Sequence, residues 1–470
     1  MAAGAAVRRS RRAEATDVIM DATALLIRKV LFPAWVRKNK SSRLAYAEQL
    51  ERTQFLAPDA IRDLQWTQFQ TVLQHAFDHC PFYRKKLSAI GMIPSDVRTL
   101  DQIASVPTTT KMEIQESLPD LLADNFRGCP LIKDMTGGST GAPMVFYYDN
   151  DRRDSRTAAT LRHDRWTGWD IGEKLALLWG APRDIAGPGY LRGRVRDWIL
   201  NRTIVLDASA IDEARMRTFC DRLQRYKPKF VLAYANTLAL FARFVRDAGL
   251  RPMRPQAIIC SGEVLTAENR ALIESTFGCP VFNRYGSREF AVIASECAVH
   301  QGMHVNAENL LVEVLADGIP SSSQSGEIVI TDLKNFAMPI IRYRTMDTGR
   351  RSDTSCNCGR GLPLLEVTGG RVTDFLIAVT GQKVSGIVLA TYAITNIPGV
   401  RQIQFVQERG DAVTARLACG PEWSNDSLNQ LTARVRTFLG ESMVIQVELV
   451  DHIPLERSGK YRFTISTLPA

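Results

Sequence analysis

Hydrophobic residues recur along the chain with two different spacings, and each spacing predicts a different kind of element. Over 59–77 apolar residues return every three or four positions, which predicts an amphipathic helix that ends before Pro81. From about residue 130 onward, short β-rich runs alternate with helical patterns, as in a doubly wound α/β layer. The expected strands are 175–179, 230–232, 257–260 and 281–284, and the expected helices are 214–225 and 237–248.

The pattern changes twice more toward the C-terminus. Two runs, 308–314 and 326–331, predict strands of a more antiparallel region. After the turn-rich residues 369–374, the expected elements are a strand at 375–379, a helix at 389–395, strands at 400–407 and 413–418, a helix at 424–439 and a strand at 444–449. This order predicts a small α+β domain.

The predicted fold class is therefore α/β, with a large multi-layer N-terminal domain containing doubly wound sheets and a small α+β C-terminal domain. The expected division has three parts: a helical N-terminal segment over 1–110 packed on the large domain, the large domain over 111–373 and the small domain over 374–470.

Composition and charge exclude some classes of protein. Hydrophobic residues make up 45% and charged residues 23% of the 470, which is ordinary for a globular protein and argues against disorder. The net charge of +9 comes from 59 basic and 50 acidic residues that are mostly interspersed. The one tight basic run is Arg8, Arg9, Arg11 and Arg12. Since no recognition motif accompanies the charge, we expect no nucleic-acid partner.

No apolar run reaches the roughly 18–20 residues of a membrane span, so we expect no transmembrane segment. The best candidate, 22–36, is interrupted by Arg28, Lys29 and Pro33 and predicts an amphipathic helix packed on the body. Peripheral membrane contact is the alternative for this helix. The opening residues lack the pattern of a secretory signal, so the expected location is cytoplasmic.

A loop rich in glycine and hydroxyl residues is the strongest local motif. Positions 135–143 read Met-Thr-Gly-Gly-Ser-Thr-Gly-Ala-Pro. Backbone amides and hydroxyls in such a loop can surround phosphate oxygens. The loop is not a P-loop, because Ala-Pro follows where that motif has Gly-Lys-Ser/Thr. A surface turn is the alternative interpretation.

Two later segments carry polar residues that suit a nucleotide. In 284–290, Tyr285 could stack on a purine and Glu289 could hold Mg2+ between phosphates, although an ordinary strand-to-helix corner would look the same. In 341–350, Asp347 is placed to accept hydrogen bonds from ribose hydroxyls. Farther on stand Arg371 and, in a glycine-flanked loop, Lys460.

These motifs occur in one order over most of the chain, and together they resemble the adenylate-forming superfamily of acyl-CoA synthetases. The sequence is most similar to the phenylacetate–CoA ligase family, particularly its branch associated with capsular polysaccharide genes. Segments 80–84, 107–111 and 260–263 also look like that family.

The resemblance implies a role for each matching residue. The implied catalytic residues are Lys460, which bridges the carboxylate and the α-phosphate, Glu289, which binds Mg2+, and Arg371, which contacts ribose or phosphate. The implied ATP-binding residues are Thr136, Gly137, Gly138, Ser139, Thr140, Gly141, Ser261, Gly262, Glu263, Tyr285, Gly286 and Asp347. Asp374 is implied as the hinge about which the small domain, carrying Lys460, rotates.

Two positions depart from the family pattern. Many relatives have lysine at the position of Ala142, which implies a missing phosphate contact here. Met346 stands where glycine usually precedes the ribose aspartate, which implies a changed turn.

Three of the nine cysteines suggest a metal site. Cys356 and Cys358 form a Cys-x-Cys pair, and Cys297 lies upstream near His300 and His304. Three thiolates and one imidazole are the ligands of a closed tetrahedral zinc site, so a structural Zn2+ is expected. The resemblance favours His304 over His300 as the fourth ligand. The alternative is three cysteines that simply occupy loops.

The expected function is ATP-dependent adenylation of a carboxylic acid, followed by acyl transfer to coenzyme A. One alternative passes the acyl group to an amine or a sugar in polysaccharide biosynthesis, and another is a non-catalytic nucleotide-binding relative. The expected cofactors are ATP, Mg2+, coenzyme A and Zn2+. The expected partners are a small-molecule carboxylic acid and the acyl acceptor, and a second copy of the chain, giving a homodimer, is a further candidate.

Overall fold

A computed structural model describes most of the chain. The described residues are 21–136, 144–179, 202–207, 213–352, 354–371, 375–381, 383–385, 389–390, 393, 397–454 and 462–468.

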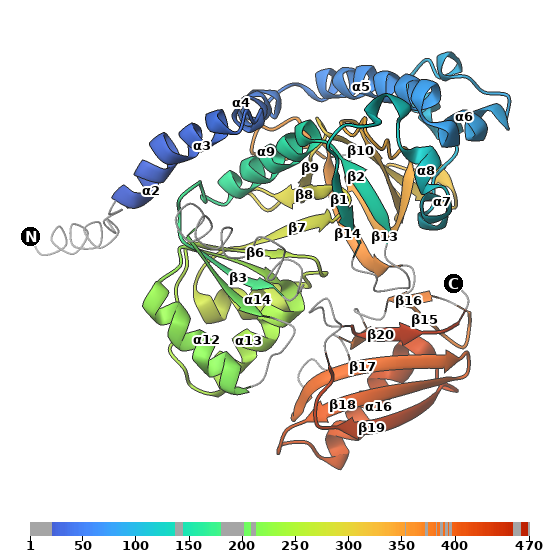
Figure 1. Cartoon of the computed structure of the whole chain (residues 1–470). Coiled ribbons are helices and arrows are strands. Elements are labelled where there is room, and N and C mark those ends of the chain that lie inside the picture. Colours follow the sequence, from blue (N-terminus) through green and yellow to red (C-terminus); the bar gives the residue numbers. More distant parts are fainter. Residues whose placement is uncertain are drawn as a thin grey trace, which may run out of the picture.

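Helices form most of the described N-terminal region and run along one edge of the molecule (Figure 1). The first helices are α2 (Ala22–Leu26), the π-helical turn η1 (Ile27–Leu31), α3 (Phe32–Lys38) and α4 (Arg43–Thr53). They are followed by α5 (Pro58–His79), α6 (Pro81–Ser88), α7 (Lys111–Glu116) and α8 (Leu118–Leu121). The helix predicted at 59–77 is α5, and Pro81 separates it from α6 because proline cannot continue the hydrogen-bond ladder.

A 12-stranded sheet forms the centre of the molecule, in the order β11-β10-β12-β13-β14-β9-β8-β7-β6-β5-β3-β4. Its parallel half consists of β3 (Leu175–Trp179), β4 (Thr203–Asp207), β5 (Phe230–Tyr234), β6 (Ala257–Ser261) and β7 (Val281–Ser287). Helices α12 (Glu213–Tyr226), α13 (Ala235–Asp247) and α14 (Ala267–Phe277) share one apolar core with these strands. The strands and helices predicted for this region are all present.

The other half of the sheet is antiparallel. It consists of β8 (Ala291–Glu296), β9 (Met303–Val305), β10 (Leu310–Ala316), β11 (Ile319–Pro320), β12 (Gly326–Asp332), β13 (Tyr343–Ser352) and β14 (Leu364–Arg371). Strand β7 joins the halves, since it pairs in parallel with β6 and antiparallel with β8. The predicted doubly wound and antiparallel regions are thus parts of one continuous sheet.

Helix α9 (Asn150–Trp166) is held against the antiparallel half by two buried ion pairs. Arg152 Nε lies 2.8 Å from Asp332 Oδ2, and Arg162 Nη1 lies 2.5 Å from Glu308 Oε1. A charge without water is tolerated only with a close opposite charge, so these pairs fix the position of the helix. A short hairpin, β1 (Ile132–Met135) and β2 (Val145–Tyr148), precedes α9.

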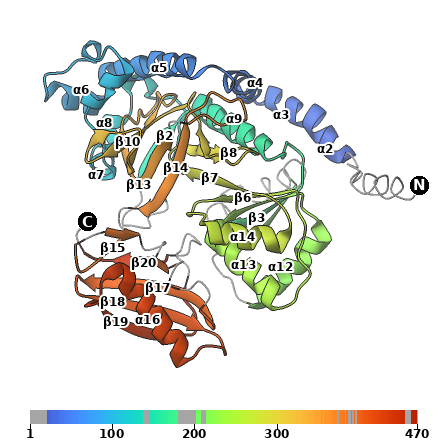
Figure 2. The same ribbon diagram turned by 180° about the vertical axis from the view of Figure 1, so that it is seen from behind.

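The C-terminal region has a sheet and an apolar core of its own. The sheet order is β19-β18-β17-β20, formed by β17 (Val400–Arg409), β18 (Ala412–Cys419), β19 (Val444–Val450) and β20 (Thr464–Ser466). Helix α16 (Asn425–Leu439) packs on it, and β15 (Phe375–Ile377) pairs with β16 (Lys383–Ser385) beside it. Figure 2 shows this region from behind, below the antiparallel strands.

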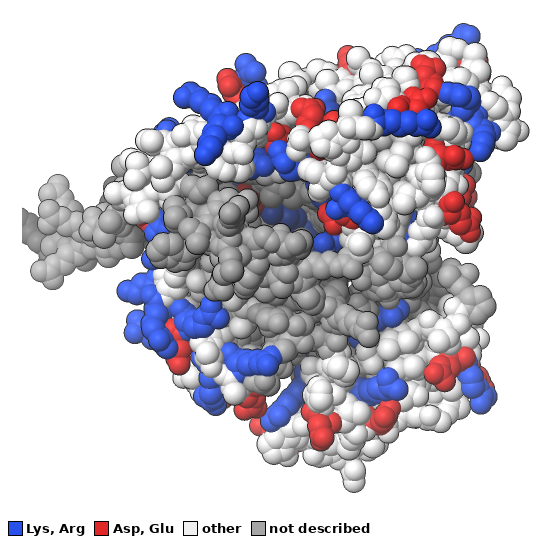
Figure 3. All heavy atoms as spheres, in the orientation of Figure 1, with Lys and Arg blue, Asp and Glu red and all other residues white. Residues whose placement is uncertain are grey.

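The structure confirms the predicted fold class: a mixed α/β body around a large sheet, with a separate α+β unit at the C-terminus. None of the helices in the described part of the chain combines the length and hydropathy that a membrane span needs. Basic and acidic side chains are interspersed over the visible part of the face in Figure 3, as the sequence indicated.

Candidate functional site

The carboxyl ends of three neighbouring parallel strands place several predicted site residues at one edge of the sheet. Tyr234 at the end of β5 pairs with Ser261 at the end of β6, and Ser261 pairs with Arg284 of β7. In open α/β sheets ligands bind at this edge. Tyr285 and Gly286 follow Arg284 directly in β7.

The chain turns sharply after β6. Gly262 has φ +76°, a conformation that glycine adopts without steric cost. Glu263 then turns back, and its Oε2 accepts a 2.7 Å hydrogen bond from the backbone N–H of Asn236 at the start of α13. Tyr234 is buried and stacks on Trp179 at the end of β3, with ring centroids 4.1 Å apart. These residues form the wall of the sheet edge next to β7.

Tyr285 and Asp347 are brought together although they belong to different strands. The phenol of Tyr285 donates a 2.6 Å hydrogen bond to Oδ2 of Asp347 in β13. Burial and the Asp347 charge hold the pKa of Tyr285 well above its usual value, and Glu289 acts in the same direction. The phenol is therefore protonated and acts as a donor at neutral pH.

The backbone near Asp347 is irregular. Asp347 pairs with Arg371 at the end of β14, and the register between β13 and β14 shifts on both sides of Thr348. Met346 has φ +66°, a region that side chains other than glycine rarely adopt. Position 346, where the family resemblance implied a changed turn, thus has a glycine-like conformation. Arg371 is placed next to Asp347 by its backbone.

The turn after β7 depends on a close approach of backbone to backbone. A Cβ on Gly286 would lie 2.6 Å from the carbonyl oxygen of Ala291 in β8, so only glycine fits without movement. Glu289, the predicted Mg2+ ligand, lies half-buried in the turn between β7 and β8. The sheet edge therefore holds Tyr285, Glu289 and Asp347 in one neighbourhood.

The predicted phosphate loop joins β1 to β2. Thr136 and Met144 close the base of this hairpin with two 2.9 Å hydrogen bonds, one to the Thr136 hydroxyl. Gly137, Gly138, Ser139, Thr140, Gly141 and Ala142 lie outside the described residues.

Two cationic side chains beside that hairpin were not predicted from the sequence. Arg288, in the turn after β7, has its Nη1 3.9 Å from Oδ1 of Asp134 in β1. Arg156 of α9 donates a 2.7 Å hydrogen bond to the Arg288 carbonyl oxygen, and its guanidinium lies over the ring of Tyr148. Arg288 thus lies beside strand β1, which leads into the predicted phosphate loop, and Arg156 lies at the other end of the same hairpin.

Two predicted residues of the C-terminal region cannot be placed. Asp374 and Lys460 lie outside the described residues, and of Arg371 only the backbone is described.

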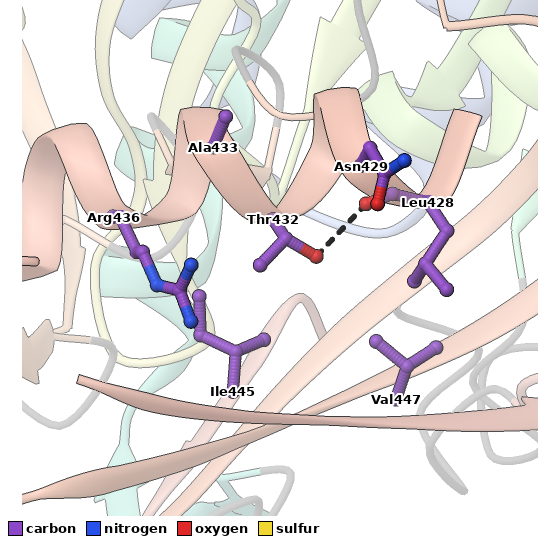
Figure 4. A pocket seen from close by; sticks show the side chains of 7 residues that line it. All are labelled: Leu428, Asn429, Thr432, Ala433, Arg436, Ile445 and Val447. Carbon is purple, nitrogen blue, oxygen red and sulfur yellow. Dashed lines mark hydrogen bonds between the residues drawn. The ribbon is translucent and has the colours of Figure 1, made fainter. Parts of the chain in front are cut away.

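A hollow of about 390 Å3 lies elsewhere in the C-terminal region, between α16 and β19. Figure 4 shows its lining, in which the Thr432 hydroxyl donates to the Leu428 carbonyl. It includes none of the predicted site residues.

The four predicted metal ligands converge. Cys297 follows β8, His304 lies in β9, and Cys356 and Cys358 come from the loop between β13 and β14. The ligand atoms of these residues all lie within 4.8 Å of one another. Cys297 Sγ is 3.7 Å from Cys356 Sγ, and Cys358 Sγ is 3.3 Å from His304 Nε2. His300 instead bonds Glu296, Nδ1 to Oε2 at 3.0 Å, so the geometry selects His304.

The protonation states suit a cation. Burial and the charge of Arg360 lower the pKa of His304 to about 4, so its imidazole is neutral, as a ligand must be. Burial alone would raise the pKa of Cys358, but hydrogen bonds from the backbone and side chain of Arg360 lower it. Burial raises the pKa of Cys297 to about 12, a shift that a bound divalent cation would reverse.

Side chains from distant segments surround this cluster. Trp166 of α9 packs edge-on against the His304 ring at 5.4 Å, and Arg360 lies over Trp166 at 4.6 Å. Trp166 Nε1 and Arg360 Nε both donate to Oε1 of Gln54, each at 2.9 Å. His75 and His79, four residues apart, do not belong to this cluster. Nε2 of His75 is hydrogen-bonded to the Phe336 carbonyl oxygen, and Nδ1 of His79 is hydrogen-bonded to Asp124.

Comparisons with known proteins show which proteins this chain is similar to. A family model described as the CapK C-terminal domain matches residues 376–467. The chain is 25% identical to protein CapK of Staphylococcus aureus, over 86% of this chain and 89% of that protein. It is also 25% identical to phenylacetate–coenzyme A ligase of Aromatoleum evansii, over 70% of this chain and 74% of that one.

The fold is that of a solved CoA ligase. The structure of 2-hydroxyisobutyryl-CoA ligase in the postadenylation state superposes with a TM-score of 0.72 at 20% identity, covering 88% of this chain and 91% of that one. The same ligase in its thioesterification state gives a TM-score of 0.56. The overall arrangement of the present chain is therefore closer to the postadenylation form.

Proposed function

We propose that this homologue of the phenylacetate–CoA ligases and of CapK is an AMP-forming ligase that activates a carboxylic acid with ATP and transfers the acyl group to coenzyme A. The observation that carries the proposal is the meeting of Tyr285 and Asp347 at the sheet edge, with Arg371 paired to Asp347. A fixed carboxylate beside an aromatic ring suits a nucleoside, since the carboxylate accepts from ribose hydroxyls while the ring packs on the base.

In this proposal each part of the edge has one task. Asp347 accepts hydrogen bonds from the ribose, and Tyr285 orients that carboxylate while its ring borders the adenine. Ser261, Gly262 and Glu263 line the adenine side. Thr136 and the loop after it hold the phosphates, with the guanidinium of Arg288 close by. The carboxylic acid would lie beside Tyr234 and Asn236, at the ends of β5 and the start of α13.

The chemical problem is the attack of one anion on another. The acid carboxylate attacks the α-phosphate, a bond forms between them, and pyrophosphate leaves. Positive charge placed where negative charge develops lowers this barrier. We propose that Lys460 supplies that charge and that Glu289 holds Mg2+, which would offset the charge on the phosphates. Glu289 fits this role as a half-buried carboxylate in the turn beside Tyr285.

The second half-reaction needs a different arrangement. We propose that residues 374–470 form a unit that rotates about Asp374, withdrawing Lys460 so that a thiol can reach the acyl-AMP. A separate sheet and a separate apolar core in this region support the proposal, because such a unit can move without loss of its own packing.

We propose that Cys297, His304, Cys356 and Cys358 hold a structural Zn2+. In a tetrahedral site with Zn–S bonds of about 2.3 Å, two sulfur ligands lie about 3.8 Å apart. The separation of 3.7 Å between Cys297 Sγ and Cys356 Sγ fits that distance and is far too long for a disulfide. Four protein ligands leave no open position, so the expected role is structural rather than catalytic.

The test is acid-dependent exchange of pyrophosphate into ATP, measured with a panel of aryl and aliphatic acids. Lys460→Ala should abolish exchange with the accepted acid. Lys85→Ala, which changes an exposed lysine of α6 that has no proposed role in the site, should leave exchange unchanged. Exchange that survives in Lys460→Ala would refute the role of that lysine. ATP binding with no exchange for any acid would favour a non-catalytic relative.

A second acceptor class has specific support. The part of the chain that would meet the acceptor, residues 376–467, matches the CapK C-terminal domain. An amine or a sugar acceptor in polysaccharide biosynthesis is therefore the second candidate. If coenzyme A is the acceptor, it should accelerate the consumption of preformed acyl-AMP. Acceleration by amines or sugars but not by coenzyme A would favour the second.

The same proposal includes a cytoplasmic location, no nucleic-acid partner and assembly as a homodimer. Light scattering of the purified chain tests the homodimer. For the second point, we expect the chain not to change the electrophoretic mobility of duplex DNA or RNA at low salt.

A further inference from the structure

The helical segment 22–38, made of α2, η1 and α3, has an inner face that is firmly attached to the body. Ile27 is buried in a cluster with Ala47, Leu50, Ala158, Ala159, Leu161 and Ile171. Arg28 forms ion pairs with Asp170 and Glu173, each at 3.2 Å, and donates to the Ile171 carbonyl oxygen. The segment therefore has a fixed orientation, and its other face points away from the molecule at the rim seen in Figure 1.

That outer face is apolar in its first half. Leu25, Leu26, Val30 and Leu31 are 40%, 50%, 53% and 37% exposed. They are four of the fifteen large hydrophobic side chains that are exposed in the described residues, and they fall within seven positions. Single exposed leucines need no explanation, whereas a contiguous group of this kind marks an interaction surface.

The π-helical turn η1 adds Leu31 to this group. In an ordinary α-helix Leu31 would lie on the same face as Ile27, four residues earlier. Here Phe32 N–H bonds to the Ile27 carbonyl, one residue later than usual, so Phe32 takes the inner position and Leu31 turns outward. Ile27 is 1% exposed while Leu31 is 37% exposed. A π-turn is rare and is found frequently at functional positions.

Basic side chains accompany the apolar group along the same segment. Residues 22–47 contain six basic side chains and no Asp or Glu. Arg28 and Arg43 are paired with carboxylates of the body. The exposed basic residues of the segment and its end are Lys29, Arg37, Lys38 and Lys40. An apolar stripe that lies beside lysine and arginine matches the two layers of an anionic membrane surface, acyl chains below and phosphate headgroups above.

We propose that the outer face of segment 22–38 docks the protein on an anionic lipid surface. Leu25, Leu26 and Val30 enter the boundary of the acyl chains, while Lys29, Arg37 and Lys38 meet the headgroup phosphates. The helix lies in the plane of the interface and does not cross it. The sheet edge with Tyr285 is formed by other elements, so docking leaves the adenylation site open.

The test is co-sedimentation of the full chain with vesicles of phosphatidylcholine, with and without phosphatidylglycerol. We expect binding that requires phosphatidylglycerol and weakens with salt. Leu26→Glu/Val30→Glu should reduce the partition coefficient by about tenfold or more, since it places charge in the apolar boundary. Val444→Glu/Leu449→Glu, which adds the same charge at exposed apolar positions of β19, should bind like the wild type. Arg37→Ala/Lys38→Ala should weaken the dependence on anionic lipid.

Several outcomes would overturn the proposal. Equal binding to both kinds of vesicle, no binding to either, or undiminished binding of Leu26→Glu/Val30→Glu would each do so. If the wild type is a dimer by light scattering that Leu26→Glu/Val30→Glu converts to a monomer, without vesicle binding, the face is an interface between copies. Thermal unfolding and pyrophosphate exchange of the same variants separate a folding defect or a failed catalytic assignment from a docking defect.

Discussion

The phenolic oxygen of Tyr285 and Oδ2 of Asp347 lie 2.6 Å apart, although 62 residues separate them in the sequence. Tyr285 lies in β7, the last strand of the parallel half, and Asp347 lies in the antiparallel strand β13, so the hydrogen bond connects the two halves of the sheet. It fixes the carboxylate that we propose as the ribose ligand before any nucleotide arrives. Preorganisation of this kind reduces the ordering that binding would otherwise require.

Tyr285→Phe removes the hydroxyl and leaves the ring. A hydrogen bond to a charged group contributes about 1.5–3 kcal/mol, so we expect the KM for ATP to rise by about tenfold. Tyr46→Phe is the matched control, because the Tyr46 hydroxyl makes the same 2.6 Å bond to Asp151 on the surface. Pyrophosphate exchange at varied ATP measures both. Equal behaviour of the two variants would remove Tyr285 from the nucleotide site.

Met346→Gly should stabilise the protein. A side chain at φ +66° costs about 1–2 kcal/mol relative to the right-handed region, and glycine avoids most of that cost. After the extra chain entropy of glycine, we expect a net gain of about 0.5–1 kcal/mol in urea unfolding. Met112→Gly, at a more exposed methionine in the first turn of α7 (64% against 40%), should instead destabilise by up to about 1 kcal/mol. A loss at both positions would show that the conformation at 346 carries no strain.

The start of α7 should make stability depend on acid pH. Burial alone would raise the pKa of Glu113, but the Lys86 ammonium at 2.6 Å and the hydrogen bonds from Thr110 lower it. Because the folded-state pKa is the lower one, the stabilisation is present above the unfolded pKa of about 4.3 and is lost as the pH falls below it.

Glu113→Gln should therefore be less stable than the wild type at about pH 7, and the difference should shrink near about pH 3.5. Glu116→Gln, at an exposed position of the same helix, serves as the control. Urea midpoints at both pH values measure the effect. A difference that stays constant with pH would contradict the role of the Glu113 charge.

The protein purified without chelator should contain about one zinc per chain. Cys297→Ser and Cys358→Ser should each lose the metal and lower the unfolding temperature, because the remaining ligands no longer close the site. Cys129→Ser changes an exposed cysteine elsewhere and should do neither. Metal analysis and thermal unfolding test this. Full zinc content in both ligand variants would eliminate the four-residue site.

The sequence predicted the elements with strong periodicity and missed those whose form depends on their partners. Strand β3 was expected at 175–179 and lies there, because five consecutive apolar residues leave a clear pattern; Ala176 and Leu178 are buried and the other three are half-buried. Strands β8, β9 and β13 were not predicted. Strand β9 has only three residues, and β13 is largely polar with a burial pattern that does not alternate, so pairing rather than propensity makes them strands.

Site residues were easier to name than to place. Ordered motifs selected Tyr285 and Asp347, yet nothing local in the sequence predicts that β7 and β13 bring them within a hydrogen bond. The register that sets His304 opposite Leu364 brings its side chain to the three cysteines, which the sequence alone does not reveal. The outward orientation of Leu31 could not be predicted from the sequence either, because an apolar run does not show where a π-helical turn adds one residue to the helix.

The hairpin of β13 and β14 carries Cys356 and Cys358 in its loop, and Asp347 beside Arg371 at its opposite end. Its loop end pairs in regular register, whereas the shifts lie around Thr348. A tether at the loop would therefore limit how far the strands can slide, and sliding is what would separate Asp347 from its partners. The two proposed sites share one hairpin, so loss of the proposed Zn2+ should weaken the proposed nucleotide contact at Asp347 as well as lower the stability of the fold.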